Sequence, residues 1–257
     1  MTNIKKSSNQ TDPWSGLKEY TAARIALGRT GTAEPLDALL QFRLAHAHAR
    51  DAVYAVLDQQ MLLNDLQALQ RAAFTLQTQA GSRSEYLQFP HKGRRLHVKS
   101  YDQLVEFNST GYDVSIVLAD GLSATAINNH AIPVLKLLLP VLDNANFSVA
   151  PVCIVQESRV ALGDECGYLF KAKLVVVLIG ERPGLSSPNS LGVYLTWRPA
   201  PGLTDEARNC ISNIRPEGLN YQVAAEKIFF LINEAFRLQL SGVALKDIAH
   251  QVGSNAS

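Results

Sequence analysis

Apolar residues recur at spacings of three and four along the first third of the chain. Between Trp14 and about Phe74 the sequence is rich in Ala and Leu, and the clearest periodic stretch runs from Pro35 to about Leu57. This period is typical of amphipathic helices, and Gly28 and Gly31 stand where a preceding helix would end. The pattern predicts two or three helices in this part of the chain.

The rhythm changes after Gly111 to short β-branched runs that alternate with helical patterns. Near-continuous apolar runs such as VVVLI predict strands that are buried on both faces, as in a mostly parallel sheet covered by helices. The predicted strands are Val114 to Ala119, Val149 to Val155, Leu174 to Ile179 and Val193 to Trp197. The predicted helices of this half are Ser123 to Leu142, Leu162 to Lys171 and Tyr221 to Leu240, with a short one at Ser100 to Phe107 before them.

Charge and cysteine content exclude several classes of protein. The 257 residues are 47% apolar and carry a net charge of +1, so no overall field attracts nucleic acid or an anionic membrane. The three cysteines, Cys153, Cys166 and Cys210, have neither metal-ligand nor disulfide-framework spacing. Pro133 and Pro140 interrupt the longest apolar run, and no apolar stretch follows the polar start. We therefore expect a cytoplasmic protein with no signal peptide and no membrane span.

Residues that could bind a ligand are expected directly after the predicted strands, because ligands of open α/β sheets bind beyond the carboxyl ends of the strands. Asp120 to Ser123 form a tight turn into a helix, with backbone N–H groups that could meet a polar ligand. Glu181 and Arg182 follow another strand beside a rigid turn. Asp120 taken alone is read as a helix cap, and the charged pair alone as a solvated turn. Together they leave a ligand site and these simpler roles equally open.

The common catalytic and nucleotide motifs are missing. No G-x-G-x-x-G follows a strand, and neither G-x-x-x-x-G-K-[ST] nor G-x-S-x-G occurs. His46 and His48 are two residues apart on a predicted helix and should point in different directions, so joint metal binding is not expected. No nucleophile is nominated by these patterns.

Three strings, VLADGLSATAI, VVVLIGERPGL and RNCISNIRPEGL, resemble the small subunit of ethanolamine ammonia-lyase in their order and separation. DPWSGLKEYTAARIALGRTG and LLQFRLAHAHARDAV are similar to it too, so the likeness covers about Asp12 to Gly242. It implies a Rossmann-like domain, preceded by a helical region, that docks on a large TIM-barrel subunit. The expected division is a disordered tail at 1–12, a helical N-terminal region at 13–98 and a Rossmann-like cobalamin-binding domain at 99–257.

The resemblance also implies a cofactor and a reaction. Adenosylcobalamin would lie between the two subunits of a hetero-oligomer, base-on, and ethanolamine would be converted to acetaldehyde and ammonia through an adenosyl radical. The large subunit would hold ethanolamine and most catalytic residues, so this chain is expected to be inactive alone. The sequence lacks the D-x-H-x-x-G motif of cobalamin domains whose histidine replaces the tail base.

The family's cobalamin-contacting positions match Val160 in ESRVALGD, Glu181 in IGERPGL and Cys210 in RNCISN, with Arg159 beside the first as a further candidate. Glu181 agrees with the strand-end argument, since a carboxylate there can accept hydrogen bonds from corrin amides or ribose hydroxyls. Val160 and Cys210 are expected to make apolar or main-chain contacts, without cobalt ligation by the thiol.

Two departures and two alternatives accompany this interpretation. Ser186 stands where a glycine is expected, and the N-terminal tail is short beside members that carry an encapsulation sequence, which leaves a bacterial microcompartment location open. One alternative is a free-standing Rossmann-like enzyme that acts on a nucleotide-bearing small molecule. The other is a structural partner that never touches the cofactor.

Overall fold

A six-stranded sheet forms the centre of the protein. The computed structural model describes residues 12–245, so nearly all of the predicted tail at 1–12 lies outside the described residues. Strands β1 to β4 run parallel and β5 and β6 antiparallel, in the order β1-β3-β2-β4-β5-β6. The predicted mostly parallel α/β sheet is confirmed. The strands are β1 Ala73–Gln77, β2 Tyr112–Ala119, β3 Val152–Gln156, β4 Ala172–Gly180, β5 Leu191–Trp197 and β6 Arg208–Ile214.

Helices cover both faces of this sheet and continue into the N-terminal part, as predicted. The α-helices are α1 Leu36–Tyr54, α2 Gln59–Ala68, α3 Arg83–Gln88, α4 Val98–Glu106, α5 Ala124–Asn144, α6 Leu162–Leu169 and α7 Tyr221–Leu238. Short 3₁₀ helices lie at Ser15–Glu19, Lys92–Arg94, Asp205–Ala207 and Gly242–Ala244.

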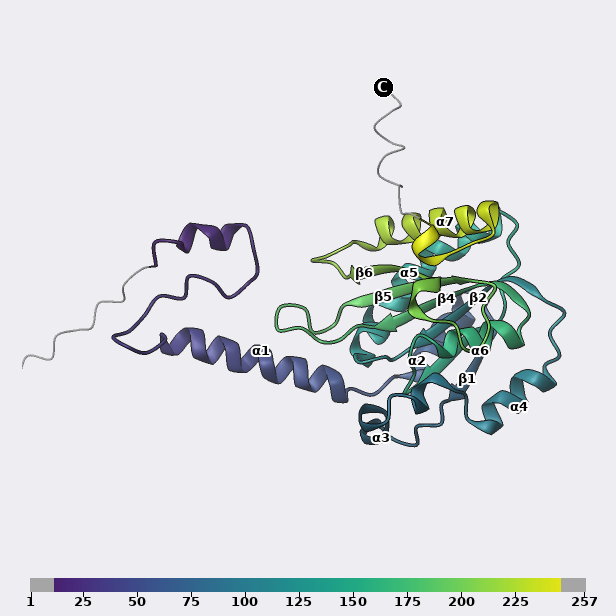
Figure 1. Ribbon diagram of the computed structural model, residues 1–257, viewed down its shortest axis with the longest axis horizontal. Coiled ribbons are helices and arrows are strands. Elements are labelled where there is room, and N and C mark those ends of the chain that lie inside the picture. The colour runs from purple at the N-terminus through teal and green to yellow at the C-terminus, as the bar shows by residue number, and fades with distance from the viewer. Residues whose placement is uncertain (1–11, 246–257) are drawn as a thin grey trace, which may run out of the picture.

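Two hydrophobic cores lie on opposite sides of the sheet. Side chains alternate along a strand, so Ile116 and Leu118 of β2 belong to the core with α2, α5 and α7, while Val117 and Ala119 belong to the core with α4 and α6. Figure 1 shows α7 above the sheet and α6 below it. The chain therefore forms three layers, with the sheet buried between two helical ones.

Helix α5 runs through Pro133 and Pro140, which the sequence pattern treated as interruptions of the apolar run. Eleven of its residues are buried, and this burial offsets the backbone bonds that the prolines remove. His130 on α5 is 4% exposed and bonds through Nδ1 to the Tyr221 hydroxyl at 2.8 Å. Among the described residues α5 alone has the length and apolar composition of a membrane span, but its position is that of a core helix.

Two strands, β1 and β6, were not predicted from the sequence. β1 lies inside 13–98, the region predicted to be helical, and its pairing with β3 makes that region part of the sheet. β6 follows a 3₁₀ turn and completes the other edge beside β5. Both are edge strands that mix polar and apolar residues, so neither has the continuous apolar run that identifies a central strand.

Helix α1 extends away from the body of the protein (Figure 1). It exposes Leu40 by 53% and Leu44 by 58%, and together with the described residues before it we call it the arm, residues 12–54. The beginning of the arm meets the loop after β4, where Arg24 donates to the Leu185 carbonyl at 3.2 Å and Ser186 Oγ to the Ala22 carbonyl at 3.3 Å. Ser186, the departure from the family pattern, thus helps to hold the arm.

His46 and His48 both lie on α1, and both are exposed. His46 stacks loosely on Phe42, with ring centroids 6.4 Å apart. Within the described part of the chain no three His, Cys, Asp or Glu side chains gather as metal ligands would.

Candidate functional site

The loops after β2, β3 and β4 meet at the carboxyl edge of the parallel strands. The helices that follow β2 and β3, α5 and α6, lie on opposite faces of the sheet, so the two loops part and leave a hollow between them. The turn after β2 presses on the end of β4, because Leu122 N–H donates to the Gly180 carbonyl at 3.0 Å. A Cβ on Gly180 would lie 2.0 Å from the Ser123 carbonyl oxygen, so glycine is required for this approach.

Two adjacent hollows open at this edge. The first has a volume of about 410 Å³, and we call it the rim pocket; the second has about 520 Å³. Arg159 and Val160 line both hollows and separate them. The rim pocket is lined by Tyr86, Gly121, Leu122, Arg159, Val160, Ile179, Gly180, Glu181, Arg182 and Tyr194. The second hollow is lined by Pro90, Arg94, Arg95, Arg159, Val160, Ala161, Glu165, Pro201, Gly202, Leu203, Thr204, Asp205 and Arg208.

The structure brings the four residues expected from the sequence to one place. Arg159, Val160 and Glu181 line the rim pocket. Cys210 does not line it, but Cys210 lies directly across the β5–β6 pair from Tyr194, which does. These residues come from three separate segments, after β3, after β4 and in β6, so only the folded sheet assembles them.

One carboxylate oxygen of Glu181 accepts a hydrogen bond from the protein, and the other is available to a ligand. Its Oε2 accepts the Asn213 backbone N–H at 3.2 Å, while Oε1 has no hydrogen-bond donor among the described residues. Gly192 makes room for it, since a Cβ there would lie 3.1 Å from Glu181 Oε1. The free carboxylate oxygen can therefore accept a hydrogen bond from a ligand in the rim pocket.

The Cys210 thiol is protonated at neutral pH. Partial removal from water and the nearby Glu181 charge raise its pKa, although a hydrogen bond with the Tyr194 hydroxyl lowers it. Burial also raises the pKa of Tyr194. A neutral thiol beside a neutral phenol gives this part of the rim a polar but uncharged surface, which suits packing contact better than metal ligation or nucleophilic attack.

Arg159 and Arg182 are the two cationic side chains that line the rim pocket, and Arg159 also lines the second hollow. Its guanidinium lies over the Tyr86 ring, 4.5 Å from the ring centroid, and makes no ion pair within the described residues. Its Nε is buried without a hydrogen-bond partner there. Stacking leaves the edge of a guanidinium free, so Arg159 can still donate hydrogen bonds to a ligand in either hollow.

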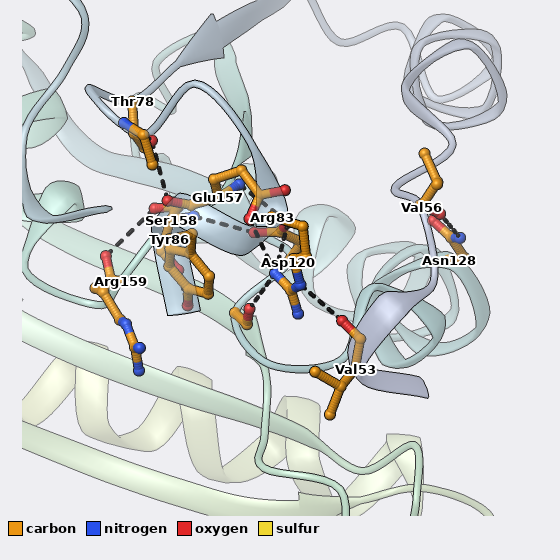
Figure 2. A network of polar contacts seen from close by, with 12 residues as sticks. Val53, Val56, Thr78, Arg83, Tyr86, Asp120, Asn128, Glu157, Ser158 and Arg159 are labelled. Atoms are coloured by element: carbon orange, nitrogen blue, oxygen red, sulfur yellow. Dashed lines mark hydrogen bonds and ion pairs between the residues drawn. The ribbon is translucent and has the colours of Figure 1, made fainter. Parts of the chain in front are cut away.

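Asp120 has a different role from those expected for it. Its carboxylate does not cap α5; Oδ2 and Oδ1 accept the backbone N–H groups of Glu157 and Ser158, each at 3.0 Å, and Oδ2 also meets Arg83 at 3.3 Å (Figure 2). Burial raises the pKa of Asp120 to about 6 despite these stabilising contacts. The expectation of free N–H groups in this turn is wrong for Leu122 and Ser123, whose N–H groups bond to protein carbonyls.

Sequence reasoning missed three residues of this region. Tyr86 and Arg83 come from α3, inside a stretch read as a connection, and Tyr194 lies in a strand predicted only for its apolar character. No local pattern could have identified the first two, because the hydrogen-bond partners of their side chains are 30 or more residues away in sequence. The alternation of side chains along β5 was the one signal for Tyr194.

Comparison with known proteins agrees with the arrangement of this edge. Residues 11–246 match the family model of the ethanolamine ammonia-lyase light chain. The ethanolamine ammonia-lyase small subunit of Pseudomonas fluorescens strain Pf0-1 is 51% identical over 241 residues, which cover 93% of this chain and 88% of that protein. The chain belongs to the ethanolamine ammonia-lyase small-subunit family. The small subunits of Azotobacter vinelandii (48% identity, 95% of this chain and 92% of the relative) and of Pseudomonas aeruginosa strain LESB58 (50%, 93% and 88%) are similar to it as well.

Membership in the small-subunit family makes this chain part of a carbon–nitrogen lyase. The match spans the arm as well as the sheet, so both lie within the part of the chain that the family model covers. A small subunit implies a larger partner in a hetero-oligomer.

Proposed function

We propose that this chain is the small subunit of an adenosylcobalamin-dependent ethanolamine ammonia-lyase and that its rim pocket covers one side of the cofactor. The observation that carries the proposal is the convergence of Arg159, Val160 and Glu181 on one pocket, with Cys210 one strand beyond. The resemblance selected these residues by motif alone, and they are as far as 51 residues apart in sequence, from Arg159 to Cys210.

The residues of the rim fit the chemistry of a corrinoid. Glu181 Oε1 can accept from a side-chain amide or a ribose hydroxyl, and Arg159 can donate to an amide carbonyl or a phosphate. Val160, Leu122 and Ile179 give the pocket an apolar floor. No histidine lines either hollow among the described residues, so the chain offers no imidazole in place of the tail base, which supports base-on binding.

The size of the pocket supports a shared site. A volume of about 410 Å³ is small for enclosing a ligand larger than a drug-sized molecule, so this chain can cover only part of a corrinoid. The remaining surface would come from the large subunit. When bound, adenosylcobalamin supplies an adenosyl radical through cleavage of its cobalt–carbon bond. The residues of this chain bind the cofactor, orient it and exclude water; we assign no catalytic residue to it.

The exposed arm supports a contact with the large subunit. Large apolar side chains exposed together on one element mark interaction surfaces. On α1 the most exposed are Leu36, Leu40, Phe42, Leu44 and Tyr54. We expect the hetero-oligomer in the cytoplasm, and the near-zero net charge gives no overall field that would attract nucleic acid or an anionic membrane.

The test replaces Glu181 by Gln in the co-expressed two-subunit enzyme. Gln keeps the size of the side chain but removes the charge that strengthens its hydrogen bonds, a loss of about 1.5 kcal/mol or about tenfold in affinity. We expect the KM for adenosylcobalamin to rise about tenfold in an acetaldehyde assay. Glu226→Gln is the matched control, because Glu226 is an exposed carboxylate on α7 that lies outside the rim pocket and accepts a hydrogen bond from Gln222 at 2.7 Å.

An unchanged KM in Glu181→Gln would contradict the placement of the cofactor and favour a structural partner that does not touch it. The chain expressed alone is expected to show no ammonia-lyase activity. Turnover of a nucleotide-bearing small molecule by the chain alone would instead support the free-standing enzyme. Visible spectra of bound cobalamin distinguish loss of the cofactor from loss of turnover.

A further inference from the structure

We propose that Asp120 and Arg83 are positioning residues for the cofactor, because they fix the loop Glu157–Val160 that presents Arg159 and Val160 to the rim pocket. The proposal rests on the proposed function, since it assigns a role within the same site. Neither Asp120 nor Arg83 lines the rim pocket, so neither is proposed to touch the cofactor.

Every backbone polar group from Glu157 N to Arg159 O has a partner. Asp120 accepts the two N–H groups of Glu157 and Ser158, and the Glu157 carbonyl accepts from Thr78 Oγ1 at 3.0 Å. The Ser158 carbonyl accepts from the Tyr86 hydroxyl at 3.0 Å. The Arg159 N–H donates to the Gly93 carbonyl at 2.8 Å, and its carbonyl accepts the Leu162 N–H at 3.0 Å. So complete a set of bonds leaves the loop one conformation.

That conformation is strained and needs to be held. Glu157 has φ +54°, in the left-handed region that residues other than glycine rarely adopt. Such backbone persists only where surrounding contacts impose it. Gly93 permits the close approach, since a Cβ there would lie 2.8 Å from the Glu157 carbonyl oxygen. Asp120 is the side chain that holds this strained residue most directly, because it accepts the N–H group of Glu157 and that of the next residue, Ser158.

Arg83 supplies the countercharge and joins the loop to its surroundings. Its Nη1 lies 3.1 Å from Glu157 Oε2 and donates to the Gly121 carbonyl at 2.9 Å, while its Nε donates to the Val53 carbonyl at 2.6 Å (Figure 2). Val53 lies in the last turn of α1. Arg83 therefore connects the loops after β2 and β3 with the base of the arm.

The network ends on the residue that is proposed to meet the ligand. Arg83 and Arg159 both lie over the Tyr86 ring, 4.9 and 4.5 Å from its centroid. Tyr86 thus orients the Arg159 side chain through its ring and the Arg159 backbone through its hydroxyl bond to Ser158. A shift of the loop would move Arg159 and Val160 together, while leaving Glu181 in place after β4.

The test is Asp120→Asn in the co-expressed two-subunit enzyme. The amide has one acceptor oxygen, so one of the two loop N–H groups would face an NH₂ group instead. We expect the KM for adenosylcobalamin to rise about tenfold, the lower range for residues that orient ligating groups. The kcat at saturating cofactor should stay within about twofold, because bound cofactor restores the loop. A general loss of folding would instead lower the active fraction without changing KM.

Asp113→Asn is the matched control at the other end of β2. Asp113 likewise accepts a loop N–H, that of Ser148 at 2.9 Å, and pairs with Lys173 at 2.8 Å. Asp113 lies at the amino edge of the sheet, away from the rim pocket. The Asp113→Asn enzyme should therefore keep the wild-type KM for adenosylcobalamin. A similar rise in KM for Asp113→Asn and Asp120→Asn would overturn the proposal.

A second variant keeps the test decisive if Asp120→Asn fails to assemble. Thr78→Val keeps the shape of the side chain and removes one bond to the loop, that to the Glu157 carbonyl. It should raise the KM for adenosylcobalamin about threefold, and an unchanged KM would overturn the proposal.

Glu181→Gln distinguishes a failure of the positioning role from a failure of the cofactor site itself. If Glu181→Gln raises KM and neither loop variant does, the cofactor site stands and the positioning role fails. If none of these variants changes KM, the cofactor does not lie at this rim, and both proposals fail.

Discussion

Removing one partner from the most deeply buried ion pair should destabilise the protein strongly. Arg208 at the start of β6 and Asp164 on α6 are joined at 2.7 Å, and both side chains are 1% exposed. The pair ties the strand that carries Cys210 to the helix that follows Val160. Asp164→Ala would leave the Arg208 guanidinium buried without its countercharge.

The burial of the pair and the remaining bonds of Arg208 determine how much unfolding free energy Asp164→Ala should lose. Loss of one partner from a buried pair costs about 3 to 5 kcal/mol, because the remaining charge stays out of water. Arg208 keeps bonds to Thr196 Oγ1 at 3.2 Å and to the Leu203 carbonyl at 3.0 Å, and these neutral acceptors do not replace a carboxylate. Asp205 at 3.4 Å is 95% exposed and compensates little. We therefore expect a loss of about 3 kcal/mol or more in the free energy of unfolding.

Urea unfolding followed by circular dichroism measures this loss, with the double variant Asp164→Leu with Arg208→Met as the control. Apolar replacement of both partners removes the unpaired charge, so the double variant should be more stable than Asp164→Ala by at least about 2 kcal/mol. A loss below about 1 kcal/mol for Asp164→Ala, at an unchanged urea dependence, would refute the reasoning. A double variant as unstable as the single one would refute it as well.

Two further predictions concern pH and assembly. Burial raises the folded-state pKa of Asp120 from 3.8 to about 6, so the folded state binds the proton more tightly than the unfolded state and this contribution to stability is lost as pH rises from about 4 to 7. The stability of the wild type relative to Asp120→Asn should fall by about 3 kcal/mol over that range in urea titrations, and a rise would contradict the assignment. Leu40→Lys with Leu44→Lys should make the isolated chain more soluble and weaken its assembly with the large subunit in size-exclusion chromatography, because both leucines are more than half exposed on the arm. Unchanged assembly would exclude this face of α1 from the interface.

The sequence patterns predicted the central strands and the long helices because burial on both faces leaves a continuous apolar run. β2 and β4 were recognised for this reason, and α7 by its periodic apolar face. The edge strands β1 and β6 were missed because an edge mixes polar and apolar residues. The helix predicted at Ser123 to Leu142 is confirmed as α5 although it contains Pro133 and Pro140, because its burial offsets the local helix penalty of the prolines.

The residues of the candidate site fall into two groups, those that a sequence motif selected and those that only the fold brings together. Motif resemblance selected Arg159, Val160, Glu181 and Cys210, and the structure brings the first three to one pocket. Their contact with a cofactor stays a prediction. The supporting residues Arg83 and Tyr86 could not be selected, since the hydrogen-bond partners of their side chains lie 30 to 74 residues away and nothing local marks them. Asp120 was singled out, but as a helix cap or as part of a ligand site, and not as the residue that holds the loop after β3.

The amino-acid sequence alone determined the α/β class, the parallel central strands and the family, because periodicity and local motifs are properties of neighbouring residues. Only the tertiary structure decided that three loops meet at one edge, and that Asp120 holds the loop after β3 instead of the helix after β2. The physical reason is that hydrogen bonds and ion pairs between distant segments depend on the three-dimensional path of the chain, which the order of residues does not display.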